Sequence, residues 1–158
     1  MAPKKRLEEY FDQRLFITEM KATTKRAALE ELVETLAAGG KVRDKSLILE
    51  MLERREALGS TGIGHGVAIP HGRSLAANQI MVVFGKSSKG VPFDSMDEKP
   101  VHLFFLILAP PQDRHNQYLP FLGKVVELIK EKPVRDRLME VRSFEDFQSV
   151  LSEGQSDE

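Results

Sequence analysis

The chain has 158 residues, 41% of them hydrophobic and 30% charged, and a formal net charge of −1, which suits one globular domain with its own core. The near-neutral charge argues against nucleic acid binding, and the absence of cysteine excludes disulfides, thiolate nucleophiles and cysteine-ligated zinc. No apolar run reaches membrane-spanning length and no signal peptide pattern is present, so we expect a cytoplasmic protein without direct membrane insertion.

The polar start of the chain, residues 1–14, is expected to form a loosely ordered extension. The folded domain is then expected to cover residues 15–153. Its first residues, Leu15-Phe16-Ile17, form either a short strand or a docking segment.

Two amphipathic helices are predicted next. Thr24 can cap a helix whose apolar residues recur at helical spacing. Asp44 can cap a second helix that runs to about Leu58. That length places Arg54 and Arg55 in the last turn, where the helix dipole favours cations.

A glycine-rich loop precedes a short extended segment. Four of the eight residues at 59–66 are glycine, which excludes a helix and disfavours a central strand. Residues 67–69 are extended, and Pro70 interrupts the strand because it has no backbone N–H. His71 therefore stands where a strand ends, a position at which α/β folds bind ligands. The unobstructed N–H groups of the glycine-rich loop suit an anionic group.

Two apolar segments, residues 80–84 and 101–108, have strand length and no alternation, as in strands covered on both faces. A polar, turn-rich segment separates them. Helical patterns then return, and Pro120 marks either a kink or a position just after a helix start. Pro133 opens another helix, and Ser143 can cap the last one. This order predicts an α/β fold with a mixed central β-sheet flanked by helices on both faces, a helix–sheet–helix sandwich.

The four histidines are the side chains that titrate nearest to neutral pH. The local pattern agrees equally well with His71 as a nucleophile and with His71 as a chance surface residue. His115 suits a polar helix start, and His65 is either a second ligand or a tolerated turn residue. His102, within the most apolar strand, suits a core histidine with a hydrogen-bond partner. No two histidines have the spacing that aligns two imidazoles on one helix face, so no metal site is expected.

Two segments are similar to nucleotide-binding loops but lack required residues. Gly85-Lys86-Ser87 is similar to the end of a P-loop, yet Ile80 occupies the position that requires glycine. Residues 62–66 begin like a dinucleotide-binding loop, but the third glycine is misplaced and no helix follows. We therefore expect no nucleotide cofactor.

The segment from Arg55 to Gly72 reads REALGSTGIGHGVAIPHG. It resembles the enzyme IIA signature of the fructose/mannitol family of the phosphoenolpyruvate-dependent phosphotransferase system. The similarity is greatest to the nitrogen-regulatory branch of that family. The resemblance extends over nearly the whole chain and includes the strand pattern and the helix start at His115.

The resemblance implies a phosphotransferase with a phosphohistidine intermediate and without a cofactor. His71 would accept a phosphoryl group from the histidine phosphocarrier protein and pass it to a IIB component or a regulatory target. Arg55 would lie near the phosphate, and His115 would be a second active-site histidine. Further phosphate contacts are expected from four residues of the glycine-rich loop: Ser60, Thr61, Gly62 and Gly64. We hypothesise that Nε2 of His71 attacks while a backbone carbonyl holds the other ring nitrogen and fixes the tautomer.

Two positions depart from the family pattern. His65 stands where nitrogen-regulatory members tend to carry asparagine, so the resemblance assigns it no role. Pro120 is atypical next to the helix start. Nitrogen-related regulation and fructose or mannitol transport both remain open, and the lack of a IIB-like or IIC-like segment in the sequence favours regulation. A third alternative is a binding module that has lost phosphate transfer, and the presence of His71, Arg55 and His115 argues against it.

Overall fold

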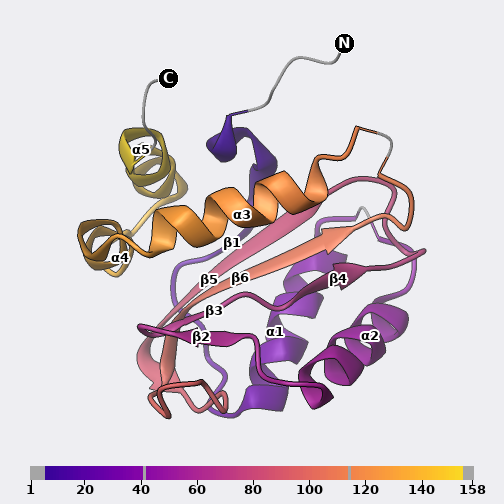
Figure 1. Ribbon diagram of the computed structural model, residues 1–158, viewed down its shortest axis with the longest axis horizontal. Helices are drawn as coiled ribbons and strands as arrows, with labels where there is room; N and C mark the ends of the chain where they lie inside the picture. The colour runs from indigo at the N-terminus through magenta and orange to yellow at the C-terminus, as the bar shows by residue number, and fades with distance from the viewer. Residues whose placement is uncertain (1–5, 41, 114, 155–158) are drawn as a thin grey trace.

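A mixed six-stranded sheet lies at the centre of the computed structural model, which describes residues 6–40, 42–113 and 115–154 (Figure 1). The strands are paired in the order β1-β5-β6-β3-β2, and β4 also pairs with β6. β5–β6 and β2–β3 are antiparallel, whereas β1–β5, β3–β6 and β4–β6 are parallel. The strand bounds are β1 Phe11–Ile17, β2 Gly62–Gly64, β3 Val67–Ala68, β4 His71–Arg73, β5 Met81–Val91 and β6 Val101–Ala109.

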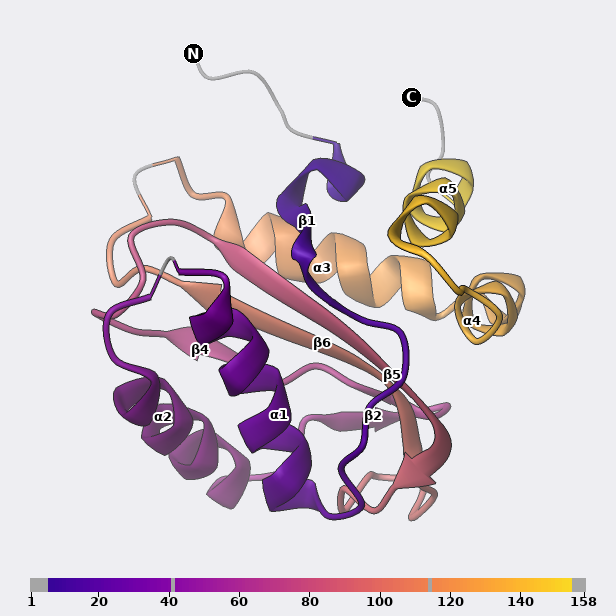
Figure 2. The same ribbon diagram turned by 180° about the vertical axis from the view of Figure 1, so that it is seen from behind.

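Helices cover both faces of the sheet, so the predicted sandwich is confirmed (Figures 1 and 2). One face carries α1 (Lys25–Ala38) and α2 (Lys45–Ala57). The other carries α3 (Tyr118–Ile129), α4 (Lys132–Leu138) and α5 (Phe144–Gly154). Successive residues of β6 alternate between the two cores, which explains the missing polar alternation. None of the helices in the described part of the chain is long and apolar enough to cross a bilayer.

The helix caps predicted from the sequence are present. The Thr24 hydroxyl accepts a hydrogen bond from the Ala27 N–H at 3.1 Å, and the Asp44 carboxylate accepts one from the Leu47 N–H at 3.2 Å. The Ser143 hydroxyl accepts one from a backbone N–H in the first turn of α5. Pro120 lies in the first turn of α3, where an N–H has no partner within the helix, so the helix begins just before it without a kink.

The start of the chain differs from the sequence-based expectation of a polar extension over residues 1–14. Residues 7–10 form a short 3-10 helix, η1 (Leu7–Tyr10), and β1 already begins at Phe11. The Leu7 side chain is 1% exposed and Phe11 is 7% exposed, and both pack in the core beneath α3 and α5. The folded part therefore begins before residue 15, and residues 1–5 lie outside the described residues.

The strands near the glycine-rich loop also differ from expectation. The chain was expected to leave the sheet at His71, but it rejoins β6 as β4, with His71 opposite Ile107. Pro70 interrupts the ladder because it lacks an N–H, yet its carbonyl accepts a hydrogen bond from the Ile107 N–H at 2.9 Å. β5 is longer than predicted and reaches Val91, with a register irregularity after Lys86.

Replacement of Leu7 by alanine tests whether the start of the chain belongs to the core. We expect Leu7→Ala to lower the free energy of unfolding by about 2–5 kcal/mol, because it removes a buried side chain and leaves a cavity. Leu75→Ala is the control, since Leu75 is 79% exposed. Urea denaturation measures both variants, and equal stability of the two would show that residues 7–14 are an extension after all.

Candidate active site

His71 is half-buried at the start of β4, and its ring is held by the backbone two residues earlier. Its Nδ1 lies 2.7 Å from the carbonyl oxygen of Ile69. A carbonyl oxygen can only accept, so Nδ1 carries the proton in the neutral ring and donates this hydrogen bond. The lone pair of the neutral imidazole is therefore on Nε2. This is the arrangement that the sequence-based hypothesis requires.

Gly72 allows α2 to pack directly against β4. A Cβ atom on Gly72 would lie 2.3 Å from the Met51 sulfur, closer than atoms can approach. Arg55 follows Met51 by one helical turn, so it lies on the same side of α2, the side that faces β4. Arg55 is half-buried, and its Nη1 donates to the Gly59 carbonyl at 2.9 Å. The last turn of α2 thus brings a guanidinium to the end of the sheet that holds His71.

A buried carboxylate fixes the segment that leads to His71. Glu56 is 8% exposed, and it accepts hydrogen bonds from the backbone N–H of Thr61 at 3.0 Å and from the Thr61 hydroxyl. Lys25 on α1 forms an ion pair with the same carboxylate at 3.1 Å. The Thr61 carbonyl in turn accepts from the Ile69 N–H at 3.0 Å. A chain of polar contacts therefore runs from α1 to the residue whose carbonyl orients His71.

The four loop residues predicted to bind phosphate lie in different surroundings. The Thr61 hydroxyl is engaged by Glu56, and the Ser60 hydroxyl donates to the Phe93 carbonyl at 2.6 Å. The Gly62 N–H donates to the Ser60 hydroxyl at 3.0 Å. Gly64 pairs with Val67, which in turn pairs with Leu103 of β6. Leu103 lies four residues before Ile107, the partner of His71, or about 13 Å away at the usual rise of a strand. The structure thus engages Ser60, Thr61 and Gly62 within the chain and does not bring Gly64 to His71.

Arg73 and Tyr118 complete the site, and the sequence did not single them out. Arg73 follows His71 by two residues on β4, so both side chains lie on the α3 face. Its guanidinium lies 4.8 Å from the centre of the Tyr118 ring, and its Nη1 donates to the Pro110 carbonyl at 3.2 Å. Predicting β4 as a strand would have revealed Arg73, because alternation places residues 71 and 73 together.

His115 is exposed in the turn before α3, and Asp113 shapes that turn. The Asp113 carboxylate accepts from the Tyr118 N–H at 2.6 Å. Burial opposes ionisation of Asp113, but backbone N–H groups, including that of His115, and the charge of Arg73 hold the pKa of its carboxyl below the usual value. The His115 turn is thereby fixed at the same end of the sheet as β4.

Two cations influence one phenol at this end of the sheet. Burial raises the pKa of Tyr118, while the positive charges of Arg73 and Arg55 act in the opposite direction. Arg73 on β4 lies 4.8 Å from the centre of the Tyr118 ring at the start of α3, and the charge of Arg55 on α2 also acts on that phenol. The same end of the sheet therefore holds two guanidinium groups and the His71 imidazole, whose Nε2 carries the lone pair in the neutral ring.

The other two histidines lie elsewhere. His102 is half-buried near the start of β6, and its Nδ1 lies 2.8 Å from the Ser87 carbonyl, as expected for a core histidine with a partner. His65 is exposed in the β2–β3 turn, in the left-handed region with φ 58°. Among the described residues, no group of three His, Cys, Asp or Glu side chains is arranged to hold a metal ion.

Exposed leucines stand on the elements that frame the site. Leu58 ends α2, Leu75 follows β4 and Leu119 lies in the first turn of α3; their exposures are 85%, 79% and 65%. These side chains give the surface around a charged centre an apolar character, which is typical of transient protein contacts.

Comparison with protein families gives one match across most of the chain. Residues 9–154 match the family described as phosphoenolpyruvate-dependent sugar phosphotransferase system, EIIA 2. A fructose-specific EIIA component of Haloferax volcanii is 35% identical over 130 residues, which cover 82% of this chain and 84% of that protein. A nitrogen regulatory protein of Bradyrhizobium diazoefficiens is 34% identical over 133 residues, covering 84% and 86% of the two chains.

Two solved structures of enzyme IIA proteins share the fold of this chain. The nitrogen regulatory protein IIA-Ntr of Neisseria meningitidis superposes with a TM-score of 0.84 at 33% identity, over 92% of this chain and 98% of that chain. The IIA mannitol structure of Escherichia coli superposes with a TM-score of 0.75 at 24% identity, over 89% and 98% of the chains.

Glu56→Gln tests the buried contacts that support the site. We expect it to lower the free energy of unfolding by about 2 kcal/mol, because an amide keeps the shape but loses the charge that pairs with Lys25. Glu50→Gln is the control on the same helix, since that exposed ion pair with Arg54 contributes about 0–1 kcal/mol. Thermal or urea unfolding compares the two, and similar losses would contradict the role given to Glu56.

Proposed function

Because the chain belongs to the EIIA 2 family of the phosphoenolpyruvate-dependent sugar phosphotransferase system, and is a phosphoryl carrier of that system, we propose that it carries the phosphoryl group on Nε2 of His71. The observation that carries this proposal is the hydrogen bond from Nδ1 of His71 to the Ile69 carbonyl. That bond leaves Nε2 as the nitrogen with a lone pair, directed away from the backbone.

Transfer would occur by in-line displacement between two imidazoles. The P–N bond to the donor histidine breaks, and its electron pair returns to the donor ring. A new P–N bond forms to Nε2 of His71 while the proton stays on Nδ1, held by Ile69. In the second transfer His71 is the donor: its P–N bond breaks, the electron pair returns to Nε2, and the phosphoryl group passes to the acceptor. Such a loose, anionic transition state depends mainly on positioning and on positive charge.

Three side chains are proposed to supply that charge or to donate hydrogen bonds. Arg73 lies against the Tyr118 ring, and the positive charges of Arg73 and Arg55 both oppose the rise in the pKa of that phenol. His115 lies in the turn that Asp113 fixes at the start of α3. Preorganised donors of this kind stabilise developing negative charge without having to reorganise during the reaction.

The donor is proposed to be the histidine phosphocarrier protein and the acceptor a IIB component or a regulatory target, all in the cytoplasm. Enzyme IIA mannitol of Escherichia coli has been solved in complex with its phosphorylated enzyme IIB. In the present chain, the exposed leucines at positions 58, 75 and 119 provide an apolar rim on which such partners can dock briefly.

We propose a regulatory output for this carrier. The nitrogen regulatory IIA-Ntr fold superposes with a TM-score of 0.84 and shares 33% of the sequence. Transport is the second candidate, because the fructose-specific EIIA component of Haloferax volcanii has a similar identity, 35%. Incubation of the phosphorylated protein with a fructose-type IIB component separates the two. Rapid transfer to that component would favour transport, and retention of the phosphate would favour regulation.

Phosphorylation from phosphoenolpyruvate tests the site. With enzyme I and the histidine phosphocarrier protein present, we expect acid-labile, base-stable label on the wild-type protein and none on His71→Ala. Arg55→Ala should slow labelling about 100-fold, the usual cost of removing one charge-stabilising donor. Arg54→Ala is the matched control and should label normally, because Arg54 is exposed and pairs with Glu50.

Two results would contradict the assignment. One is an unlabelled wild-type protein when the donor proteins are active on another substrate. The other is normal, base-stable labelling of His71→Ala, which would place the phosphate on a different histidine.

A further inference from the structure

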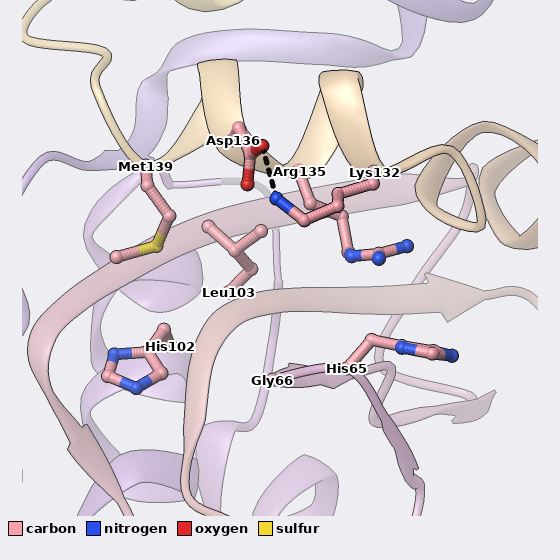
Figure 3. Close-up of a pocket in the computed structure, with 8 residues that line it drawn as sticks. All are labelled: His65, Gly66, His102, Leu103, Lys132, Arg135, Asp136 and Met139. Atoms are coloured by element: carbon pink, nitrogen blue, oxygen red, sulfur yellow. Dashed lines mark hydrogen bonds and ion pairs between the residues drawn. The ribbon is translucent and has the colours of Figure 1, made fainter.

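Figure 3 shows a pocket with a volume of about 290 Å³. The strand register places it at the other end of the sheet from His71. Three segments that are distant in the sequence form it: the β2–β3 turn, the first residues of β6, and α4. Its β6 residue Leu103 lies four positions before Ile107, the partner of His71, or about 13 Å along the strand. The pocket is therefore separate from the candidate active site.

The lining of the pocket is rich in basic side chains. Lys132 and Arg135 come from α4, and His65 and His102 come from the sheet side. The one carboxylate in the lining belongs to Asp136, and it is paired with the Lys132 ammonium at 2.7 Å. Within the described part of the chain, the Arg135 guanidinium has no carboxylate partner. The lining therefore carries an uncompensated positive charge next to two titratable imidazoles.

Arg135 is positioned to present that charge. Its Nη1 donates to the carbonyls of Ile129 at 2.8 Å and Lys130 at 2.7 Å, which fixes the guanidinium against the end of α3. Figure 3 shows the Arg135 and His65 side chains extending in the same direction from α4 and from the β2–β3 turn. Two donors from different elements thus line the same side of one pocket.

His65 lies in the left-handed region of the backbone, where non-glycine residues are uncommon. Its φ of 58° and that of Gly66, 77°, form a tight turn in which asparagine and glycine are preferred. Asp97 stabilises the turn through the His65 backbone N–H at 3.1 Å, so the imidazole is not needed to hold it.

The pocket also has an apolar wall, which hydrogen bonds hold in place. Leu103 is buried in β6, and Met139 ends α4. The buried Lys86 ammonium binds the carbonyls of Met139 at 3.2 Å and Val141 at 2.7 Å, which anchors the end of α4 to the sheet. The wall that Met139 forms is therefore already in place, as in most small-molecule sites.

We propose that this pocket binds a small organic phosphate monoester. The phosphate would accept hydrogen bonds from Arg135 and His65, and the organic part would lie on Leu103 and Met139. The planar Arg135 guanidinium suits phosphate oxygens, and a ring N–H of His65 can donate to another oxygen of the same group. The pocket volume, about 290 Å³, lies just below the usual range of about 300–1,000 Å³ for small-molecule sites, so the ligand must be small. This site binds a free ligand and does not depend on phosphate transfer through His71.

Phenyl phosphate is the probe for this site, followed by two-dimensional amide NMR of the full chain. We expect saturable shifts at Gly66, Leu103 and Met139, and no saturable shifts there with benzyl alcohol, which lacks the charge. His65→Asn keeps a residue suited to the turn, and Arg135→Gln keeps a donor for the α3 carbonyls. Each should weaken binding about tenfold or more, the usual effect of losing one charge-assisted hydrogen bond.

Two matched variants distinguish binding in this pocket from general attraction of phosphate to the basic surface and from binding at His71. Arg137 lies on the same helix as Arg135, but it pairs with Glu153 at 2.6 Å and does not line the pocket, so Arg137→Gln should bind phenyl phosphate normally. His71→Ala should also bind normally at the pocket. The proposal is overturned if phenyl phosphate gives no saturable shifts at the pocket. It is equally overturned if His65→Asn and Arg135→Gln bind as the wild type does, or if His71→Ala abolishes binding.

Discussion

The hydrogen bond between Nδ1 of His71 and the Ile69 carbonyl determines which ring nitrogen can act as a nucleophile, and much of the surrounding structure keeps that bond in place. Because these two residues are only two positions apart, their hydrogen bond requires a particular conformation of the backbone between them. Pro70 restricts that backbone, and its carbonyl is tied to β6 through the Ile107 N–H. On the other side, the Ile69 N–H is tied to Thr61. The imidazole is therefore oriented by the sheet itself.

A buried carboxylate in the same region holds the glycine-rich loop against α1 and α2. A carboxylate such as Glu56 is costly to bury unless it is paired and fully hydrogen-bonded. Here the cost is offset by Lys25 and by both donors of Thr61, so α1, α2 and the glycine-rich loop are locked together. Arg55, the preceding residue on α2, is left out of that cluster and faces β4. One helix turn thus contributes both the support for the loop and the cation that we propose acts on the phosphate.

Local signals explain why much of the architecture could be predicted from the sequence. The caps at Thr24 and Asp44 depend on nearby backbone N–H groups, and the apolar strand segments depend on burial on both faces. β4 could not be found in this way, because its three residues are a strand by virtue of pairing with β6. Arg73 was missed with it. Glu56 was not singled out either, since its partners Lys25 and Thr61 meet it through the fold.

The most direct test of this account is the protonation and phosphorylation state of the two His71 nitrogens. Long-range proton–nitrogen NMR of protein labelled with ¹⁵N-histidine identifies the protonated nitrogen, and phosphorus–nitrogen coupling identifies the phosphorylated one. The account predicts a proton on Nδ1 in the free protein and phosphate on Nε2 after phosphorylation. A proton on Nε2 of the free neutral ring, or phosphate on Nδ1, would contradict it.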